Sequence, residues 1–166
     1  SDENTFEQII ETALVANDIL KLAGIEGFCK TSGASGLHIY LPMGGKYTYE
    51  EARDFTKLLC YYIQEKLPKL TTLERSLKKR GPKIYLDYLQ NRKGQTIVAP
   101  YSLRPQLHAT VSMPLPWLEV KTGLKITDYT IKTVPNIMAE RKDSFKAVLG
   151  KAIDMGKAIE HLNNLS

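Results

Sequence analysis

A glycine-rich turn and the histidine that follows it could bind a phosphorylated ligand. Residues 32–36 read Ser-Gly-Ala-Ser-Gly, and His38 is the second residue of the apolar run 37–41. If that run is a strand, His38 faces away from the side used by its two neighbours. The hydroxyl of Ser32, open backbone N–H groups and an outward histidine together make a candidate phosphate cradle. The alternative is an ordinary hairpin turn with a surface histidine.

A carboxylate stands inside a second apolar run. Asp87 lies in the sequence Ile-Tyr-Leu-Asp-Tyr-Leu, residues 84–89. Burying a carboxylate among such side chains costs free energy unless the group is paired, solvated or bound to a metal. Mn²⁺ and Mg²⁺ are hard cations that take carboxylate oxygens, so either could be bound by Asp87. The alternatives are that Asp87 faces water or pairs with a nearby basic side chain.

Cationic side chains lie close to both segments. Arg104 follows a turn after residues 96–99 and could bind a phosphate through two parallel N–H groups, although it could also be an ordinary surface arginine. A basic cluster precedes the second run and consists of Arg75, Lys78, Lys79, Arg80 and Lys83. This cluster is either a solvated helix face or a salt-sensitive contact with a DNA backbone. Walker, nucleophile-elbow, zinc-protease and Cys-x-x-Cys motifs are missing from the sequence.

The elements that position these residues can be predicted from periodicity, capping boxes and turn residues. Helices are expected over residues 5–24, 48–68, 71–81 and 151–165, and strands over residues 28–31, 37–41, 84–89 and 96–99. The first two strands should pair as a hairpin, and so should the last two. Helices mixed with hairpin-like strand pairs indicate an α+β fold with a mostly antiparallel sheet.

Length and composition indicate a folded protein and are compatible with an anionic partner. The 166 residues suit a single domain over 1–166, and a net charge of +5 is compatible with nucleic acid without requiring it. Cys29 and Cys60 stand in apolar surroundings without metal-ligand spacing, which favours reduced core thiols and fits a cytoplasmic protein. With a DNA partner, the expected location is cytoplasmic and nucleoid-associated. No apolar run is long enough for a membrane span, so no membrane partner is expected.

Taken together, three segments resemble one family. The run KTSGASGLHIYLP (residues 30–42) is similar to the second motif of the archaeo-eukaryotic primase superfamily, as found in the polymerase domain of bacterial DNA ligase D. IYLDYLQNRKGQTIVAPYSLR (residues 84–104) resembles the third motif and the segment after it, and ATVSMPLPWLEV (residues 109–120) resembles the next stretch. The resemblance implies a primase-polymerase catalytic core fragment: a central RRM-like, mostly antiparallel sheet with flanking helices.

The resemblance also implies roles for individual residues. Asp87 would be the third metal-binding carboxylate and a catalytic residue, whereas Ser32 and His38 would contact the phosphates of the incoming nucleotide. Gln90 and Arg104 would fall at nucleotide-binding positions. The implied reaction is nucleotidyl transfer with two Mn²⁺ or Mg²⁺ ions, in which a primer 3′-hydroxyl attacks the α-phosphate of an NTP or dNTP and expels pyrophosphate.

One departure from the family pattern is clear. The family's first motif is an Asp-x-Asp pair, and this sequence contains no Asp-x-Asp. We therefore expect the chain to be the C-terminal part of the polymerase domain, without the N-terminal portion that carries that motif. One carboxylate cannot hold two catalytic ions in the family's manner, so we expect the chain to be inactive by itself.

Three hypotheses follow for the parent protein. The first is a metal-dependent nucleotidyltransferase module of an ATP-dependent DNA ligase D, acting in non-homologous end joining of double-strand breaks. Its expected partners are DNA ends in primer-template form, a nucleoside triphosphate, the Ku protein, and the ligase and nuclease domains of the parent chain. The alternatives are a non-catalytic nucleic-acid-binding domain of the same fold and a stand-alone primase-like polymerase. An unpaired sheet edge would also permit a homodimer.

Overall fold

The computed structural model describes residues 5–164, and its first element shows how local sequence sets the fold. Helix α1, Phe6–Leu22, begins at a capping box. The Gln8 N–H donates to Oγ1 of Thr5, and the Thr5 N–H donates to Oε1 of Gln8. These bonds satisfy backbone donors that a helix start leaves free. The predicted first helix is therefore confirmed, and it ends next to Gly24.

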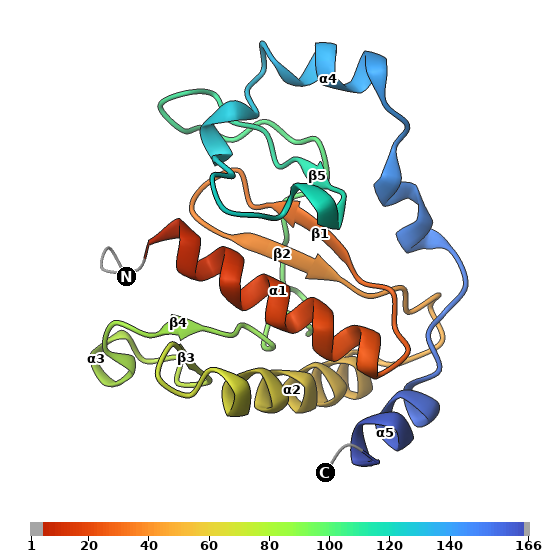
Figure 1. Cartoon of the computed structure of the whole chain (residues 1–166). Coiled ribbons are helices and arrows are strands. Elements are labelled where there is room, and N and C mark those ends of the chain that lie inside the picture. The colour runs from red at the N-terminus through yellow and green to blue at the C-terminus, as the bar shows by residue number, and fades with distance from the viewer. Residues whose placement is uncertain (1–4, 165–166) are drawn as a thin grey trace.

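A three-stranded antiparallel sheet packs against α1 (Figure 1). Its order is β2-β1-β5, with bounds β1 Phe28–Thr31, β2 Leu37–Tyr40 and β5 Pro114–Leu115. The predicted β1–β2 hairpin is confirmed, and its register places Lys30 directly opposite His38. Opposed residues share a face of the sheet, so Lys30 and His38 project to the same side. Ile39 projects to the other side, where it packs against both hydrophobic clusters of the core.

Helix α2, Tyr49–Lys66, lies alongside α1 and completes the main core (Figure 1). It also begins at a capping box, formed by Thr48 and Glu51 as predicted. Its apolar stripe packs against α1 in the main core, which contains Cys60. Cys29 lies in the second hydrophobic cluster. Cys29 and Cys60 are buried and free, and burial raises the pKa of each thiol to about 12. The prediction of reduced core thiols fits this arrangement.

The segment after α2 differs from the prediction. Residues 71–74 do not open a helix: Thr71–Thr72 form strand β3, which pairs in parallel with β4, Ile84–Tyr85. Thr71 is completely buried, and strand pairing gives the buried backbone its partners, such as the bond from the Ile84 N–H to the Leu70 carbonyl. Tertiary pairing thus outweighs a local capping signal. The basic helix shrinks to α3, Leu77–Arg80.

The predicted hairpin of residues 84–89 and 96–99 is also wrong. Only Ile84–Tyr85 form a strand, and residues 96–99 form none. Instead, the side-chain amide of Gln90 donates to the carbonyl of Thr96 at 2.6 Å, so a side chain takes the place of a strand partner. Residues 86–89 and 96–99 consequently form neither helix nor strand.

The C-terminal part runs along one side of the molecule from α4 to α5 (Figure 1). Its elements are the 3₁₀ helices Trp117–Glu119, Ile126–Asp128 and Ser144–Leu149, and the helices α4 Val134–Glu140 and α5 Met155–Asn163. Phe145 packs edge-on against Phe28 and Tyr40, with ring centroids 6.2 and 5.2 Å apart. Helix α5, shorter than the predicted 151–165, buries Leu162 in the main core; Leu165 lies outside the described residues.

Within residues 5–164, no helix has the length and apolar character that a membrane crossing requires. Mixed helices and strands around a mostly antiparallel sheet agree with the predicted α+β class.

Candidate functional site

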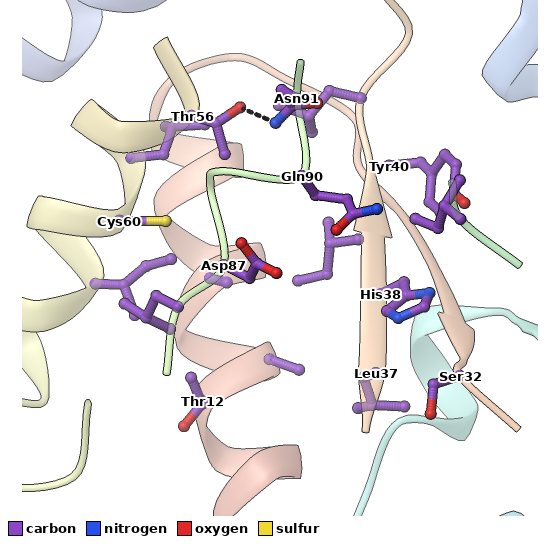
Figure 2. A pocket seen from close by; sticks show the side chains of 18 of the residues that line it. Thr12, Ser32, Leu37, His38, Tyr40, Thr56, Cys60, Asp87, Gln90 and Asn91 are labelled. Carbon is purple, nitrogen blue, oxygen red and sulfur yellow. Dashed lines mark hydrogen bonds between the residues drawn. The ribbon is translucent and has the colours of Figure 1, made fainter. Parts of the chain in front are cut away.

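One cavity brings together all five residues singled out in the sequence. It has a volume of about 580 Å³ and opens between β2, helices α1 and α2, and the segment that follows β4. Its walls include Ser32, His38, Asp87, Gln90 and Arg104. Figure 2 shows the carboxylate of Asp87, the amide of Gln90 and the ring of His38 in one view of this cavity, with Ser32 beside the start of β2. Segments far apart in the sequence therefore contribute to a single site.

In the turn after β1, the hydroxyl of Ser32 is available to a ligand, whereas two of the backbone N–H groups are not. Oγ of Ser32 accepts from the N–H groups of Ala34 and Gly36 at 3.1 and 3.0 Å. Those two N–H groups are thus already used, which corrects the expectation that they stay open to an anion. The hydroxyl hydrogen of Ser32 is not consumed by these bonds, because the oxygen is the acceptor in both. Ser32 can still donate one hydrogen bond into the cavity.

Arg104 is seated against the same turn. A Cβ added to Gly33, whose φ is +70°, would lie 2.5 Å from Cγ of Arg104, so only glycine leaves room for this arginine stem. The Arg104 N–H donates to the carbonyl of Thr110 at 2.7 Å, and the hydroxyl of Thr110 donates to the carbonyl of Gly33. Nε of Arg104 is buried and makes no hydrogen bond with the described residues. A buried guanidinium donor without a partner suits an anionic ligand.

His38 has a neighbour that the sequence reasoning did not single out. Nδ1 of His38 lies 3.2 Å from Nζ of Lys30, a fully buried residue. Burial, followed by the positive charges of Lys30 and Arg104, lowers the pKa of His38 to about 4. His38 is therefore a neutral imidazole at pH 7. The signal for Lys30 was present in the sequence, as a lysine in an apolar strand opposite a histidine.

Asp87 and Gln90 form the opposite wall, on the loop after β4. Asp87 is exposed, and its Oδ1 accepts from the N–H of Leu89 at 3.1 Å. The Asn91 amide, a second residue that sequence reasoning missed, donates to Oγ1 of Thr56 at 3.2 Å and ties this loop to α2 (Figure 2). The cavity therefore has the guanidinium of Arg104 and the neutral ring of His38 on the β2 side and a carboxylate on the loop side.

The acidic groups present do not form a two-metal site. Asp87 is the one carboxylate among the described residues that line the cavity. Across residues 5–164, no three His, Cys, Asp or Glu side chains gather in a way that could hold a metal ion. A pair of catalytic divalent ions needs several carboxylate oxygens. Asp87 can offer one ligand to such an ion but cannot hold two.

The basic cluster does not belong to the cavity. None of Arg75, Lys78, Lys79, Arg80 and Lys83 lines it. Lys83 donates to the carbonyl of Pro68 at 2.7 Å, and the guanidinium of Arg80 lies 5.7 Å from the ring centroid of Tyr85. Both side chains thus have structural contacts. A DNA contact by this cluster stays a prediction.

These features together describe an α+β domain with a cavity that combines an unpartnered guanidinium donor, a free hydroxyl hydrogen and a single carboxylate. A family model described as "LigD, primase-polymerase domain" matches residues 1–145. The chain therefore belongs to the LigD primase-polymerase domain family. The family resemblance seen in the sequence is confirmed by this match.

Relatives and a solved structure agree with this membership. The chain is 39% identical over 137 residues to the bifunctional non-homologous end joining protein LigD of Bacillus subtilis, covering 80% of this chain and 22% of that protein. It is 34% identical over 113 residues to the multifunctional LigD repair protein of Mycobacterium tuberculosis, covering 68% of this chain and 15% of that protein. The chain thus spans about a fifth of the length of these relatives, or less.

The structural match covers more of the chain. The polymerase domain of Mycobacterium tuberculosis ligase D, solved in complex with DNA, superposes with a TM-score of 0.81 at 29% sequence identity. The match covers 90% of this chain and 52% of that one. It confirms the predicted α+β polymerase-domain fold.

Proposed function

We propose that this chain forms the nucleotide-binding part of a polymerase domain that adds nucleotides to DNA ends, in a LigD protein of non-homologous end joining. The observation that carries the proposal is the convergence of Ser32, His38, Gln90 and Arg104 on one cavity. The relatives named above act in end joining by name, and the structural neighbour is a polymerase domain bound to DNA. The substrates we propose are a nucleoside triphosphate and a DNA end.

The residues of this chain suit the binding of a triphosphate. Arg104 has an unpartnered guanidinium donor, Ser32 keeps a hydroxyl hydrogen, and neutral His38 has one ring nitrogen outside its contact with Lys30. Phosphate oxygens accept hydrogen bonds and carry negative charge, so each of these groups is complementary to them. In the proposed reaction a bond forms between the primer O3′ and the α-phosphorus, and the bond to the pyrophosphate oxygen breaks. Donors held in place on the triphosphate stabilise the departing charge.

Nucleotide binding by this chain is the direct test. Isothermal titration calorimetry with ATP and with dATP should show saturable binding by the wild-type chain. Arg104→Ala should weaken the affinity by about tenfold or more, because a lost charge-assisted contact is worth about 1.5–3 kcal/mol. The matched control is Arg75→Ala, an exposed arginine outside the cavity, which should stay within about twofold of wild type. Equal affinities for the two variants would contradict the proposal.

A second candidate is binding without transfer by this chain alone. The single carboxylate in the cavity favours it, because nucleotidyl transfer in this family's manner requires two divalent ions. The two candidates separate in a primer-extension assay with Mn²⁺ that compares this chain with a full-length LigD protein containing it. Extension by the full-length protein only would support the second candidate, in which this chain binds the nucleotide and supplies Asp87 as one metal ligand. Extension by the chain alone would exclude the second candidate.

A further inference from the structure

Lys30 occupies an unusual place for a cation. It lies in β1, the central strand of the sheet, with 0% of its surface exposed. Removing an ammonium group from water costs several kcal/mol unless its hydrogens find acceptors. Among residues 5–164, no carboxylate lies within salt-bridge distance of Lys30. The ammonium group of Lys30 contacts neutral groups instead, and the hydrogen bonds it makes with them define its role.

Each of the three hydrogens of the Lys30 ammonium group has a neutral group within reach. Nζ of Lys30 lies 2.5 Å from Oγ of Ser112, and that hydroxyl donates its own hydrogen to the carbonyl of Thr31 at 2.7 Å. Since the serine hydrogen is used, its oxygen must accept from Lys30. A second hydrogen can face the ring of Tyr40, whose centroid is 5.7 Å away. The third can be donated to Nδ1 of His38, which lies 3.2 Å from Nζ.

This contact decides where His38 carries its proton. A lysine ammonium has only donors, so Nδ1 of His38 must accept the bond with a lone pair. The neutral ring then carries its hydrogen on Nε2. An imidazolium would place an Nδ1–H against the ammonium, which has no lone pair to receive it. The directions of the pKa shifts agree: burial, with Arg104 as the next cause, lowers the pKa of Lys30 to about 8, which leaves it charged at pH 7, and His38 stays neutral.

We propose that Lys30 is a positioning residue, whose buried ammonium group holds His38 in the Nε2–H tautomer and so aims a hydrogen-bond donor into the cavity. As far as the ligand is concerned, this inference rests on the proposed function, because the anion in the cavity is the triphosphate proposed above. The other tautomer would present a lone pair to phosphate oxygens, which are acceptors, and the contact would become repulsive. Nε2 of His38 makes no hydrogen bond with the described residues, so it is free for the ligand.

The tautomer can be measured without a ligand. Long-range ¹H–¹⁵N correlation spectra of the chain with ¹⁵N-labelled histidine report protonation at each ring nitrogen. The sequence has three histidines, so the signal of His38 is assigned by its loss in His38→Gln. At pH 7 we expect a protonated Nε2 and an unprotonated Nδ1. A protonated Nδ1 in the wild-type chain would overturn the proposal, whatever the variants do.

Variants of Lys30 test the cause. Lys30→Met keeps the length of the side chain and removes the donors, so the His38 signals should move to a mixture of both tautomers. Lys30→Arg keeps a donor and should restore the wild-type pattern. The control is Lys121→Met, an exposed lysine outside the cavity, which should leave the spectrum unchanged. A folded Lys30→Met protein with the wild-type tautomer would overturn the proposal, and if this variant does not fold the wild-type spectrum still decides.

Nucleotide affinity separates this inference from the proposed function. If both hold, Lys30→Met weakens the binding of ATP by about twofold or more, because only a fraction of the His38 rings then presents a donor to the phosphate. A changed tautomer with unchanged affinity would confirm the positioning of His38 by Lys30 and contradict a phosphate contact by His38. An unchanged tautomer with weaker affinity would overturn the positioning role and leave the phosphate-binding cavity in place.

Discussion

The stem of Arg104 lies so close to Gly33 that a Cβ on the glycine would be 2.5 Å from Cγ of the arginine. The same Cβ would be 3.0 Å from the backbone nitrogen of Ser112, which cannot move as a flexible side chain can. Gly33 also has a φ of +70°, a conformation that side chains disfavour. The glycine of the turn thus makes room for the cation of the cavity, and the two act together.

Gly33→Ala should therefore damage both stability and binding. The strained backbone and the contact with Arg104 should lower the free energy of unfolding by about 1–3 kcal/mol. Displacement of Arg104 should weaken ATP binding by roughly fivefold or more. Urea unfolding and calorimetry measure the two effects. Gly36→Ala is the matched control, since a Cβ there meets nothing within 4 Å; equal losses in both variants would disprove the role of Gly33.

Asp87→Asn tests the single carboxylate of the cavity. Without divalent ions the variant should bind ATP as well as wild type or slightly better, because a negative charge near the triphosphate is removed. Mn²⁺ should raise the ATP affinity of the wild-type chain more than that of the variant, by a factor of about three or more, because the cation loses an oxygen ligand in the variant. The control is Asp18→Asn, on an exposed aspartate of α1. An identical gain from Mn²⁺ in Asp87→Asn and wild type would show that Asp87 binds no cation.

The lowered pKa of His38 should make the free energy of unfolding depend on pH. Its folded value, about 4, lies below the ordinary 6.5, chiefly because the ring is buried, with Lys30 and Arg104 adding to the effect. Between pH 6.5 and 4 the unfolded chain therefore binds a proton that the folded chain does not. The free energy of unfolding should fall on acidification through this window, with His38 contributing up to about one proton to the slope.

Chemical denaturation at several pH values between 4 and 6.5 measures that slope. His38→Gln should make the dependence shallower, since the group responsible is gone. The control is His108→Gln, which removes an exposed histidine and should have the same slope of unfolding free energy against pH as the wild-type chain. If His38→Gln keeps the full slope, the ring of His38 is charged in the folded state and its assignment as neutral is wrong.

Phe145 should stabilise the sheet that carries His38. It is 4% exposed and packs edge-on against Phe28 of β1 and Tyr40 of β2. Phe145→Ala should lower the free energy of unfolding by about 3–5 kcal/mol, because a large buried ring leaves a cavity. Leu149→Ala, in the same 3₁₀ helix but 85% exposed, should change it by less than about 0.5 kcal/mol. Similar small losses would mean that the C-terminal segment is not docked on the sheet.

Features with local causes could be predicted from the sequence. Both long helices begin where expected, because the capping boxes of Thr5 with Gln8 and Thr48 with Glu51 join residues only three apart. Strand alternation placed His38 and Ile39 on opposite faces, and the family motifs singled out five of the residues that line the cavity. These signals depend on neighbours along the chain, so the sequence contains them directly.

Features with distant causes required the tertiary structure. Thr71 carries a local capping signal, yet it joins a strand because pairing with Ile84 satisfies a buried backbone. The burial of Lys30 depends on Ser112, which is brought to it by the folding of β5 beside β1. The sequence by itself determined the two long helices, the β1–β2 hairpin and the kind of ligand-binding groups. Only long-range packing decided which of these groups share a cavity and how they are charged and oriented, because burial and cross-strand contacts arise from residues far apart in the chain.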